Sequence, residues 1–401
     1  MAGSTIDHLI SLTVFIGALL IFIGLFNQTI QTAIIYQHNR FLATKCSDLL
    51  DNMLLNPGAP SNWGESGAVP SIFGLQDPNF TGYRLSSFSL MRLMSSSGNK
   101  VYYSRTGNYY SNVSWGVGGG YFLLKESECI NYSLASKLLG VNGTFGFQLT
   151  ITPILTVNIT EISRNPLKFK IQVTGLGSLL SNANLTYIIC WTEPGEDGYP
   201  NINRTDSLKL GGFPKTDSSG TAYVEFPFVR QEAAYVFIVK AQFGGLFGVG
   251  YKALDTSAGK IIPFVESYED GLVLLAQWGE NDSSGDLYFN ASFYVLSENF
   301  VPIPVVQNVT GIVNYGAINY YPMYIPTSDP GFLVVSYCNR SQYGMIVMPW
   351  GIGVLGLPVV FGDDPSRYAW VVTDIRQVIV NGIAYQAKLA LWSLEGYGVI
   401  G

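Results

Sequence analysis

The sequence predicts a mainly β protein in which a long hydrophobic N-terminal α-helix is followed by β-sandwich domains. Residues Leu9–Phe26 form an uncharged apolar run of eighteen residues, the length at which a helix becomes able to cross a membrane. Residues 27–55 contain neither Gly nor Pro, so nothing in this stretch ends the helix. Downstream of Gly146, apolar segments of strand length alternate with turns, and the 44 Gly and 25 Tyr of the chain favour turns and strands.

The N-terminal helix is expected to span residues 4–55, about 75 to 80 Å at 1.5 Å per residue. Its first half is apolar on every side, and the second half is expected to be amphipathic. The segment before the apolar run carries no Lys or Arg, and no small-residue cleavage site follows it, so a retained helix is favoured over a secretory signal peptide. The predicted apolar stripe of the second half consists of Ile30, Ile34, Phe41, Cys46, Leu49, Leu50 and Met53.

Composition excludes several functional classes. Charged residues make up 12% of the chain, and 22 Lys and Arg face 28 Asp and Glu, so the clustered positive charge that nucleic-acid binding needs is missing. A hydrophobic content of 48% is incompatible with intrinsic disorder. The two histidines, His8 and His38, lie in the helix, which leaves nucleophilic catalysis and histidine metal sites without their usual side chain. We therefore expect no enzyme and no cofactor.

Two interpretations of the helix remain open: a single-pass membrane anchor with a short stalk, and an assembly helix. Over residues 3–55 the chain resembles the N-terminal helix of type IV pilin-like subunits, especially archaeal pilins and archaellins. That resemblance implies a hydrophobic half packed in a filament core and an amphipathic half packed on the head. It assigns Asp7 to the acidic position near the mature N-terminus, although Glu is usual there. Gly17 and Gly24 would then permit close helix approach.

Twelve N-x-S/T sequons occur in the chain, roughly threefold more than random placement of its Asn, Ser and Thr gives. Glycans at such sites would supply solubilising bulk where surface charge is scarce, and they indicate an extracellular head. Asn27 is set apart because it lies at the membrane end of the helix. The other candidates are Asn79, Asn112, Asn131, Asn142, Asn158, Asn184, Asn203, Asn281, Asn290, Asn308 and Asn339.

Four cysteines form an even set, which suits disulfides in an extracellular chain. Four cysteines allow three pairings, of which we favour Cys46 with Cys129 and Cys190 with Cys338. Buried free thiols are the alternative. No CxxC spacing is present, which argues against a zinc site.

The chain divides into four predicted segments: residues 1–56, the helix and stem; residues 57–149, a small α+β head segment; residues 150–258, a β-sandwich; and residues 259–401, a C-terminal β domain. In the second segment, residues 129–141 are the one expected helix outside the stem. In the third, Phe169, Ile171 and Val173 alternate with polar residues, as in a half-solvated antiparallel strand.

The turn Thr216-Asp217-Ser218-Ser219-Gly220-Thr221-Ala222 resembles a turn found in bacterial and archaeal Ig-like surface domains. The resemblance covers residues 150–258 and implies an Ig-like fold, without implying chemistry.

Two further motifs are assigned structural roles. The uncharged segment 344–362 contains Pro349 and Pro358 and several Gly, so buried strands are predicted rather than a second membrane helix. Its Gly351, Gly353 and Gly356 match a GxGxxG pattern but are followed by a strand-like segment, which argues against dinucleotide binding. Acidic clusters are expected to be solvated turns. They lack the register of a Ca²⁺ loop.

The sequence thus predicts a structural cell-surface protein: a pilus-like filament subunit with a glycosylated exterior and an adhesion role. Its partners would be its own copies in a helical homopolymer, and the membrane would hold it through the N-terminal helix before assembly. The alternative is a single-pass membrane-anchored adhesin or receptor, or an S-layer-associated protein, whose Ig-like domains bind a ligand.

Overall fold

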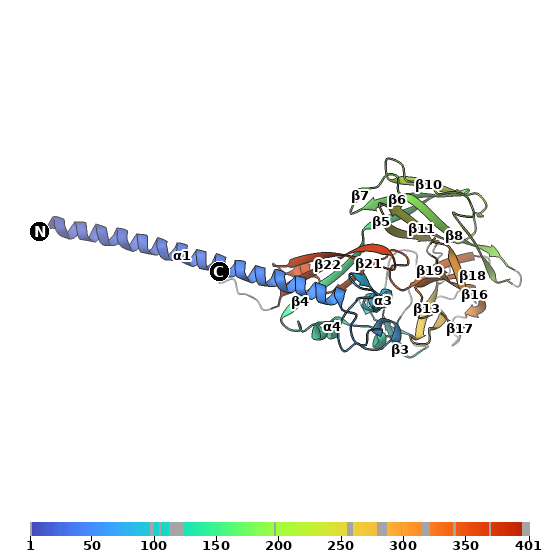
Figure 1. The fold of residues 1–401 in the computed structure, drawn as a ribbon, viewed down its shortest axis with the longest axis horizontal. Coiled ribbons are helices and arrows are strands. Elements are labelled where there is room, and N and C mark those ends of the chain that lie inside the picture. The colour runs from blue at the N-terminus through green and yellow to red at the C-terminus, as the bar shows by residue number, and fades with distance from the viewer. Residues whose placement is uncertain are drawn as a thin grey trace.

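The protein, represented here by a computed structural model, consists of one helix that projects from a β-rich head (Figure 1). The structure describes residues 2–96, 100–103, 106–111, 124–195, 198–254, 260–278, 287–297, 299–313, 321–339, 342–368 and 370–394. Helix α1, Ala2–Leu55, runs for 54 residues without interruption, or about 81 Å at the usual rise per residue. The predicted fold class is confirmed: a long apolar N-terminal helix precedes several β-sheets.

The base of α1 lies against a sheet with the order β1-β21-β22-β4-β20. Its strands are β1 (Arg84–Leu85), β4 (Phe145–Pro153), β20 (Val359–Gly362), β21 (Val372–Val380) and β22 (Ile383–Ser393). All of its pairings are antiparallel except that of β1 with β21. Because β22 pairs with β4 along nine residues, β22 shares a sheet with a strand some 240 positions earlier. The four sequence segments do not reveal this closure.

Residues 155–254 form a sandwich of two sheets. One has the order β10-β6-β5, with β7 beside β6, and the other has the order β12-β11-β8-β9. Phe169 of β6 stacks on Phe237 of β11 at 4.5 Å between ring centroids, inside a core of aromatic and aliphatic side chains. The strands are β5 (Leu155–Arg164), β6 (Leu167–Gly175), β7 (Ser178–Leu179), β8 (Asn184–Pro194), β9 (Pro200–Asp206), β10 (Thr221–Phe226), β11 (Tyr235–Phe243) and β12 (Leu246–Ala253).

The local prediction for β6 is confirmed, and the turn before β10 is stabilised by its own side chains. Strand β6 alternates buried and half-buried side chains, with Phe169, Ile171 and Val173 inside. In the turn before β10, the Asp217 carboxylate accepts hydrogen bonds from the backbone N–H groups of Ser219 and Thr221. Gly220 adopts a φ of 67° there, which a residue without Cβ tolerates readily.

The central strands β11 and β8 of the β12-β11-β8-β9 sheet are buried on both faces. Along β11, Phe237 and Val239 face the sandwich core, while Val236 and Ile238 belong to the main core of the head. That main core extends into a sheet with the order β16-β15-β18-β19. The remaining strands are β2 (Lys100–Tyr103), β3 (Asn108–Ser111), β13 (Lys260–Ser267), β14 (Leu272–Trp278), β15 (Leu287–Leu296), β16 (Pro302–Val313), β17 (Tyr321–Tyr324), β18 (Gly331–Asn339) and β19 (Gln342–Trp350).

The short helices correct one prediction. The helix expected at residues 129–141 is present as α4, Tyr132–Leu138. Asn131 caps its N-terminus, because the Asn131 side chain accepts a hydrogen bond from the Leu134 N–H. Outside the stem, however, the described chain also contains α2 (Trp63–Ser66), α3 (Ser87–Ser96) and two short 3₁₀ turns, Glu126–Glu128 and Pro365–Arg367. Many serines lower the helix propensity of α3. Tertiary burial of Phe88, Leu90 and Leu93 compensates.

Segment 344–362 is buried strand and turn, as predicted. Strand β19 leads into a turn in which Gly351, Gly353 and Gly356 have φ values of 89°, 84° and 67°, and β20 follows. Since a strand rather than a helix follows these glycines, the segment lacks the helix N-terminus on which a dinucleotide pyrophosphate rests.

Candidate functional site: the projecting helix and its junction with the head

Residues 8–41 of α1, here called the projecting segment, have no buried side chain. Its large apolar residues are exposed by 41 to 68% of their surface. Exposing so large an apolar surface to water is unfavourable, so we expect another apolar surface to cover it. The exposed residues are Leu9, Ile10, Leu12, Val14, Phe15, Ile16, Leu19, Leu20, Ile21, Phe22, Ile23, Leu25, Phe26, Ile30, Ile34, Ile35, Tyr36 and Phe41.

The projecting segment is long and apolar enough to cross a membrane, and it is longer than a crossing needs. Its 34 residues extend about 51 Å, whereas the hydrocarbon core of a bilayer is about 30 Å thick. If the run Leu9–Phe26 fills the bilayer, the part nearest the head remains outside it. That part still exposes Ile30, Ile34 and Phe41.

The predicted apolar stripe of the second half divides into two faces. Cys46, Leu49, Leu50 and Met53 are buried against the head, as expected. The prediction is wrong for Ile30, Ile34 and Phe41, which are exposed. At 100° per residue these three lie roughly a third of a turn around the helix from the buried face. Ile30 and Ile34 therefore point away from the surface on which the stem packs, whereas the Phe41 ring lies 6.4 Å from the ring of Phe145 on β4.

Threonines within α1 satisfy their own hydroxyl groups. The Oγ1 atoms of Thr13, Thr29, Thr32 and Thr44 each donate to the carbonyl oxygen four residues earlier, at 2.8 to 3.1 Å. A hydroxyl bonded in this way costs little when an apolar medium covers the helix. The helix is thus compatible with lipid or with the flank of another helix.

The predicted assembly residues Asp7, Gly17 and Gly24 all lie in α1. A Cβ atom added at Gly17 or Gly24 would meet nothing within 4 Å, and both residues lie on one side of the helix because they are seven positions apart. Asp7 belongs to the first turns of α1, but its side chain lies outside the described residues. Their role in assembly stays a prediction.

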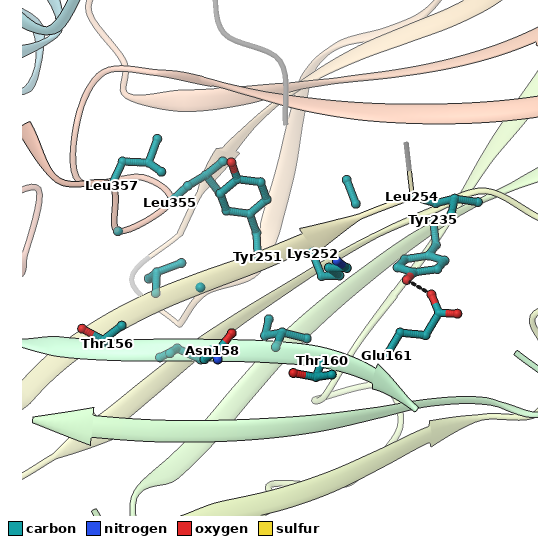
Figure 2. A pocket seen from close by; sticks show the side chains of 16 residues that line it. Thr156, Asn158, Thr160, Glu161, Tyr235, Tyr251, Lys252, Leu254, Leu355 and Leu357 are labelled. Carbon is teal, nitrogen blue, oxygen red and sulfur yellow. Dashed lines mark hydrogen bonds between the residues drawn. The ribbon is translucent and has the colours of Figure 1, made fainter. Parts of the chain in front are cut away.

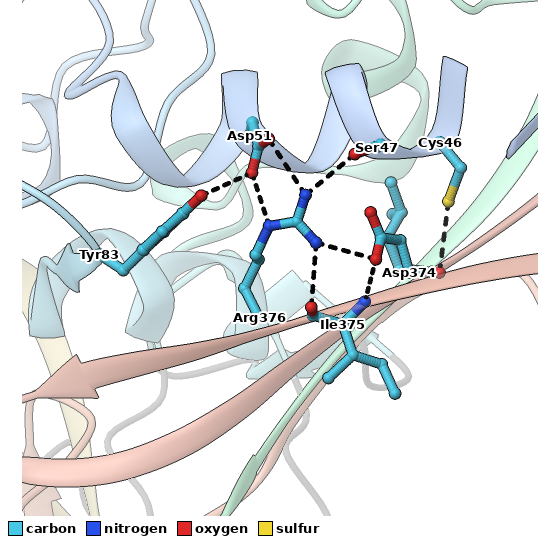
Figure 3. A network of polar contacts seen from close by, with 8 residues as sticks. Cys46, Ser47, Asp51, Tyr83, Asp374, Ile375 and Arg376 are labelled. Atoms are coloured by element: carbon cyan, nitrogen blue, oxygen red, sulfur yellow. Dashed lines mark hydrogen bonds and ion pairs between the residues drawn. The ribbon is translucent and has the colours of Figure 1, made fainter. Parts of the chain in front are cut away.

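Arg376 on β21 fixes the base of α1 to the head (Figure 3). Its Nε and Nη2 atoms donate to the two carboxylate oxygens of Asp51 at 2.9 and 3.1 Å, and Nη2 also donates to Ser47 Oγ at 2.9 Å. Nη1 donates to Asp374 Oδ1 at 2.8 Å. Tyr83 donates its hydroxyl to Asp51 Oδ1 at 2.9 Å. Both carboxylates stabilise the guanidinium and raise the pKa of Arg376 further above its already high value.

Sequence reasoning missed this junction. Asp51 and Arg376 are 325 positions apart, and no periodicity or motif connects them. The one available signal was a carboxylate beside the apolar stripe of a helix, which is usually a solvated residue. A bidentate Arg–carboxylate pair is geometrically specific, so it restricts the orientation of the stem on β21 together with the buried apolar face of the stem.

The predicted disulfides are not formed, and all four cysteines are buried free thiols. Cys46 Sγ donates to the Leu389 carbonyl of β22 at 3.5 Å, whereas Cys129 Sγ donates to the Lys125 carbonyl at 3.3 Å. The stem therefore packs its cysteine on the C-terminal strand, not on the segment that contains Cys129. Burial raises the pKa of Cys46 to about 11 and that of Cys190 to about 12. Cys338 is likewise buried, on β18.

The sequons differ in accessibility. Asn290 is a correction: it is 3% exposed on β15, because its strand lies inside the head, and a glycan cannot be accommodated there. Asn203 is half-buried. Asn112 and Asn281 lie outside the described residues, as does the side chain of Asn339. Of the sequon asparagines beyond Asn27, six are exposed: Asn79, Asn131, Asn142, Asn158, Asn184 and Asn308.

Comparisons with known proteins give no family. No family model matches the chain, and no curated protein matches it. Among solved structures, the chain is similar to a biofilm-associated protein BSP domain, with 10% identity over 50% of this chain and 30% of that one, at a TM-score of 0.15. It is also similar to red sea bream transglutaminase, with 10% identity over 60% of this chain and 37% of that one, at a TM-score of 0.17. The chain thus spans only about a third of the length of each of these two structures, and neither likeness supports a functional assignment.

Proposed function

We propose that this chain is a structural, non-enzymatic cell-surface protein whose N-terminal helix assembles copies into an extracellular filament. Before assembly, the same helix holds the chain in the membrane with the head outside. The observation that carries the proposal is the projecting segment, whose large apolar side chains the head does not bury.

The length of that segment favours copies of the chain over lipid as its final covering. A bilayer covers about 20 helical residues, and Leu9–Phe26 supplies them. Ile30 and Ile34 are then left in water in a simple anchor, whereas in a bundle of helices they pack against neighbours. Helix–helix burial stabilises by roughly 1.5 to 3 kcal/mol for each large apolar side chain removed from water.

The junction suits a subunit that repeats at a fixed angle. Helix α1 continues into the head with no break between the apolar run and the last buried turn, and the Arg376–Asp51 pair connects that turn to β21. A helical polymer requires the same orientation of head and helix in every copy. A flexible stalk, which would suit a monomeric adhesin better, is not present in α1.

The head supplies an exterior suited to extracellular space. Charged residues are scarce, at 12% of the sequence, while six sequon asparagines are exposed. Glycans on these asparagines would keep a densely packed, weakly charged surface soluble. This arrangement supports the outward orientation of the head.

Shearing intact cells and imaging the supernatant tests the proposal. Filaments in which this chain is the main component are the expected result. Recovery of the chain only in detergent extracts of membranes would refute assembly and would favour the single-pass anchored adhesin instead.

A matched pair of variants tests helix packing. Gly17→Leu should abolish filaments while leaving the chain in the membrane, because leucine prevents close approach of two helices. Ala18→Leu adds a similar volume on a different side of the helix and serves as the control. Normal filaments from Gly17→Leu would exclude tight packing at this glycine.

A further inference from the structure

A groove of about 770 Å³ runs along the edge of the sandwich between β5 and β12 (Figure 2). Both are the last strands of their sheets in the described chain. Gly248 and Gly250 bring β12 close to β5, because a Cβ atom at either position would collide with the Leu155 or Val157 carbonyl. The turn containing Leu355 and Leu357 lines the groove as well.

The two sides of the groove differ in polarity. Along β5, the exposed Thr156, Asn158 and Thr160 present hydroxyl and amide groups. Figure 2 shows Tyr251 and Leu357 across from them. A trough with hydrogen-bonding groups on one wall and an aromatic ring and aliphatic carbons on the other suits a pyranose, which has hydroxyl groups at its rim and apolar C–H faces.

The charge at one end of the groove is already compensated. The Glu161 carboxylate accepts a hydrogen bond from the Tyr235 hydroxyl and lies 3.2 Å from Arg164 Nε. Burial, followed by this hydrogen bond and the carboxylate charge, raises the pKa of Tyr235, so it remains a donor. The groove therefore has no unpaired carboxylate from Glu161 that would select a cation, and its other charged side chain, Lys252, can donate hydrogen bonds to sugar hydroxyl groups.

The groove contains its own attachment point for such a ligand. Asn158-Ile159-Thr160 is a sequon, and Asn158 and Thr160 are exposed on the same face of β5 because they are two residues apart in a strand. Ile159 between them is buried in the sandwich core. The acceptor amide thus opens directly into the space that a sugar would fill.

We propose that Asn158 carries an N-linked glycan whose first sugar units lie in this groove, against Tyr251 and the Leu355–Leu357 turn. The inference rests on the extracellular orientation in the proposed function, but it does not require filament assembly. The glycan would also cover two sheet edges, which are otherwise templates for pairing with another chain.

The covalent step needs a polyprenyl-phosphate-linked oligosaccharide as the glycosyl donor and a membrane oligosaccharyltransferase. The Asn158 Nδ2 atom attacks the anomeric carbon and forms the N–C bond. The C–O bond to phosphate breaks, and the lipid phosphate leaves with the electron pair. One Nδ2 proton passes to a base of the transferase, and nothing is oxidised or reduced.

Glycopeptide mass spectrometry on the full chain from its native cells tests the attachment. We expect a glycan on Asn158 and none on the buried Asn290. An unmodified Asn158 overturns the proposal, whether or not the cells form filaments. Modification of Asn158 on a chain found only in membranes would still support it, so its failure is distinguishable from failure of the proposed function.

Three variants expressed in the same cells test whether the glycan lies in the groove. Thr160→Ala removes the sequon, whereas Thr160→Ser retains it, and Asn142→Gln removes a sequon at an exposed turn outside the groove. In Thr160→Ala we expect a Tm lower by about 2 to 4 °C and about tenfold faster amide hydrogen exchange in residues 249–254. Thr160→Ser and Asn142→Gln should match the wild type. Equal exchange at residues 249–254 in all four chains would show that the glycan extends into solvent. That result would refute the proposal that its first sugar units lie in the groove.

Discussion

Replacing Arg376 with methionine should loosen the base of α1. Methionine keeps most of the aliphatic length of the side chain and removes the guanidinium. The lost contacts are the paired bonds to Asp51 at 2.9 and 3.1 Å, the bond to Ser47 at 2.9 Å and the bond to Asp374 at 2.8 Å. The carboxylates of Asp51 on the stem and Asp374 on β21 would then lack the cation that they share.

The expected cost follows from the burial of this junction. The side chains of Arg376 and Asp51 are 23% and 36% exposed, so the junction is intermediate between a buried and a solvated ion pair. Buried charged hydrogen bonds contribute about 1.5 to 3 kcal/mol each, and exposed ion pairs about 0.2 to 1 kcal/mol. We expect a loss of about 2 kcal/mol for the network as a whole.

Hydrogen exchange of the full chain in detergent micelles measures this cost locally. A loss of 2 kcal/mol corresponds to about 30-fold faster exchange of the amides in residues 46–55. Lys168→Met is the matched control: its pair with Glu225 spans 3.6 Å, and the two side chains are 40% and 45% exposed. The control should leave exchange of the stem unchanged and cost less than about 0.5 kcal/mol.

One result would refute the reasoning. If Arg376→Met accelerates exchange of residues 46–55 no more than Lys168→Met does, apolar packing alone holds the stem. A double-mutant cycle with Asp51→Asn adds a second criterion. A coupling energy near zero between Asp51 and Arg376 would show that their ion pair does not set the junction.

Two further predictions concern the head. Gly356→Ala should destabilise the protein by about 2 to 3 kcal/mol, because φ is 67° and the new Cβ would collide with the Val249 carbonyl. The control Gly382→Ala has a φ of 78° but open space around the new Cβ, so it should cost only about 1 kcal/mol. Equal shifts of Tm in the two variants would exclude the collision. Burial raises the pKa of Glu128 above 4.5, so the stability linked to this group is present below the pKa of the unfolded chain and is lost as pH rises through the folded pKa. Glu128→Gln should therefore raise the Tm at pH 7 and have almost no effect near pH 4, and a pH-independent shift would contradict the assignment.

Periodicity predicted the parts of the fold that are local. The alternation along β6 and the presence of a helix within residues 129–141 each depend on side chains within a few positions of one another, although that helix, Tyr132–Leu138, is shorter than predicted. Helix α3 was missed because its serines compete for backbone hydrogen bonds. Its formation depends on burial of residues such as Phe88 by distant segments.

The candidate site was predicted unevenly for the same reason. The apolar run Leu9–Phe26 is a property of consecutive residues, so it could be recognised without a structure. The direction of each face of the stem could not, because Ile34 and Leu49 are equally apolar and only the position of the head makes one exposed and the other buried. The cysteine pairing failed likewise, since it depends on which strand the stem meets.

The sequence by itself determined that the chain has a long apolar helix, a β-rich head and many sequons. Hydrophobic periodicity, helix-breaking Gly and Pro and short motifs depend only on residues that are neighbours in the sequence. Only the tertiary structure decided where the helix leaves the head, which thiols stay free, and that Asn158 opens into a groove while Asn290 is enclosed. These outcomes depend on contacts between residues hundreds of positions apart, such as Asp51 with Arg376 and Cys46 with Leu389. Such contacts depend on how the whole core packs, so they cannot be predicted from any one segment of the sequence.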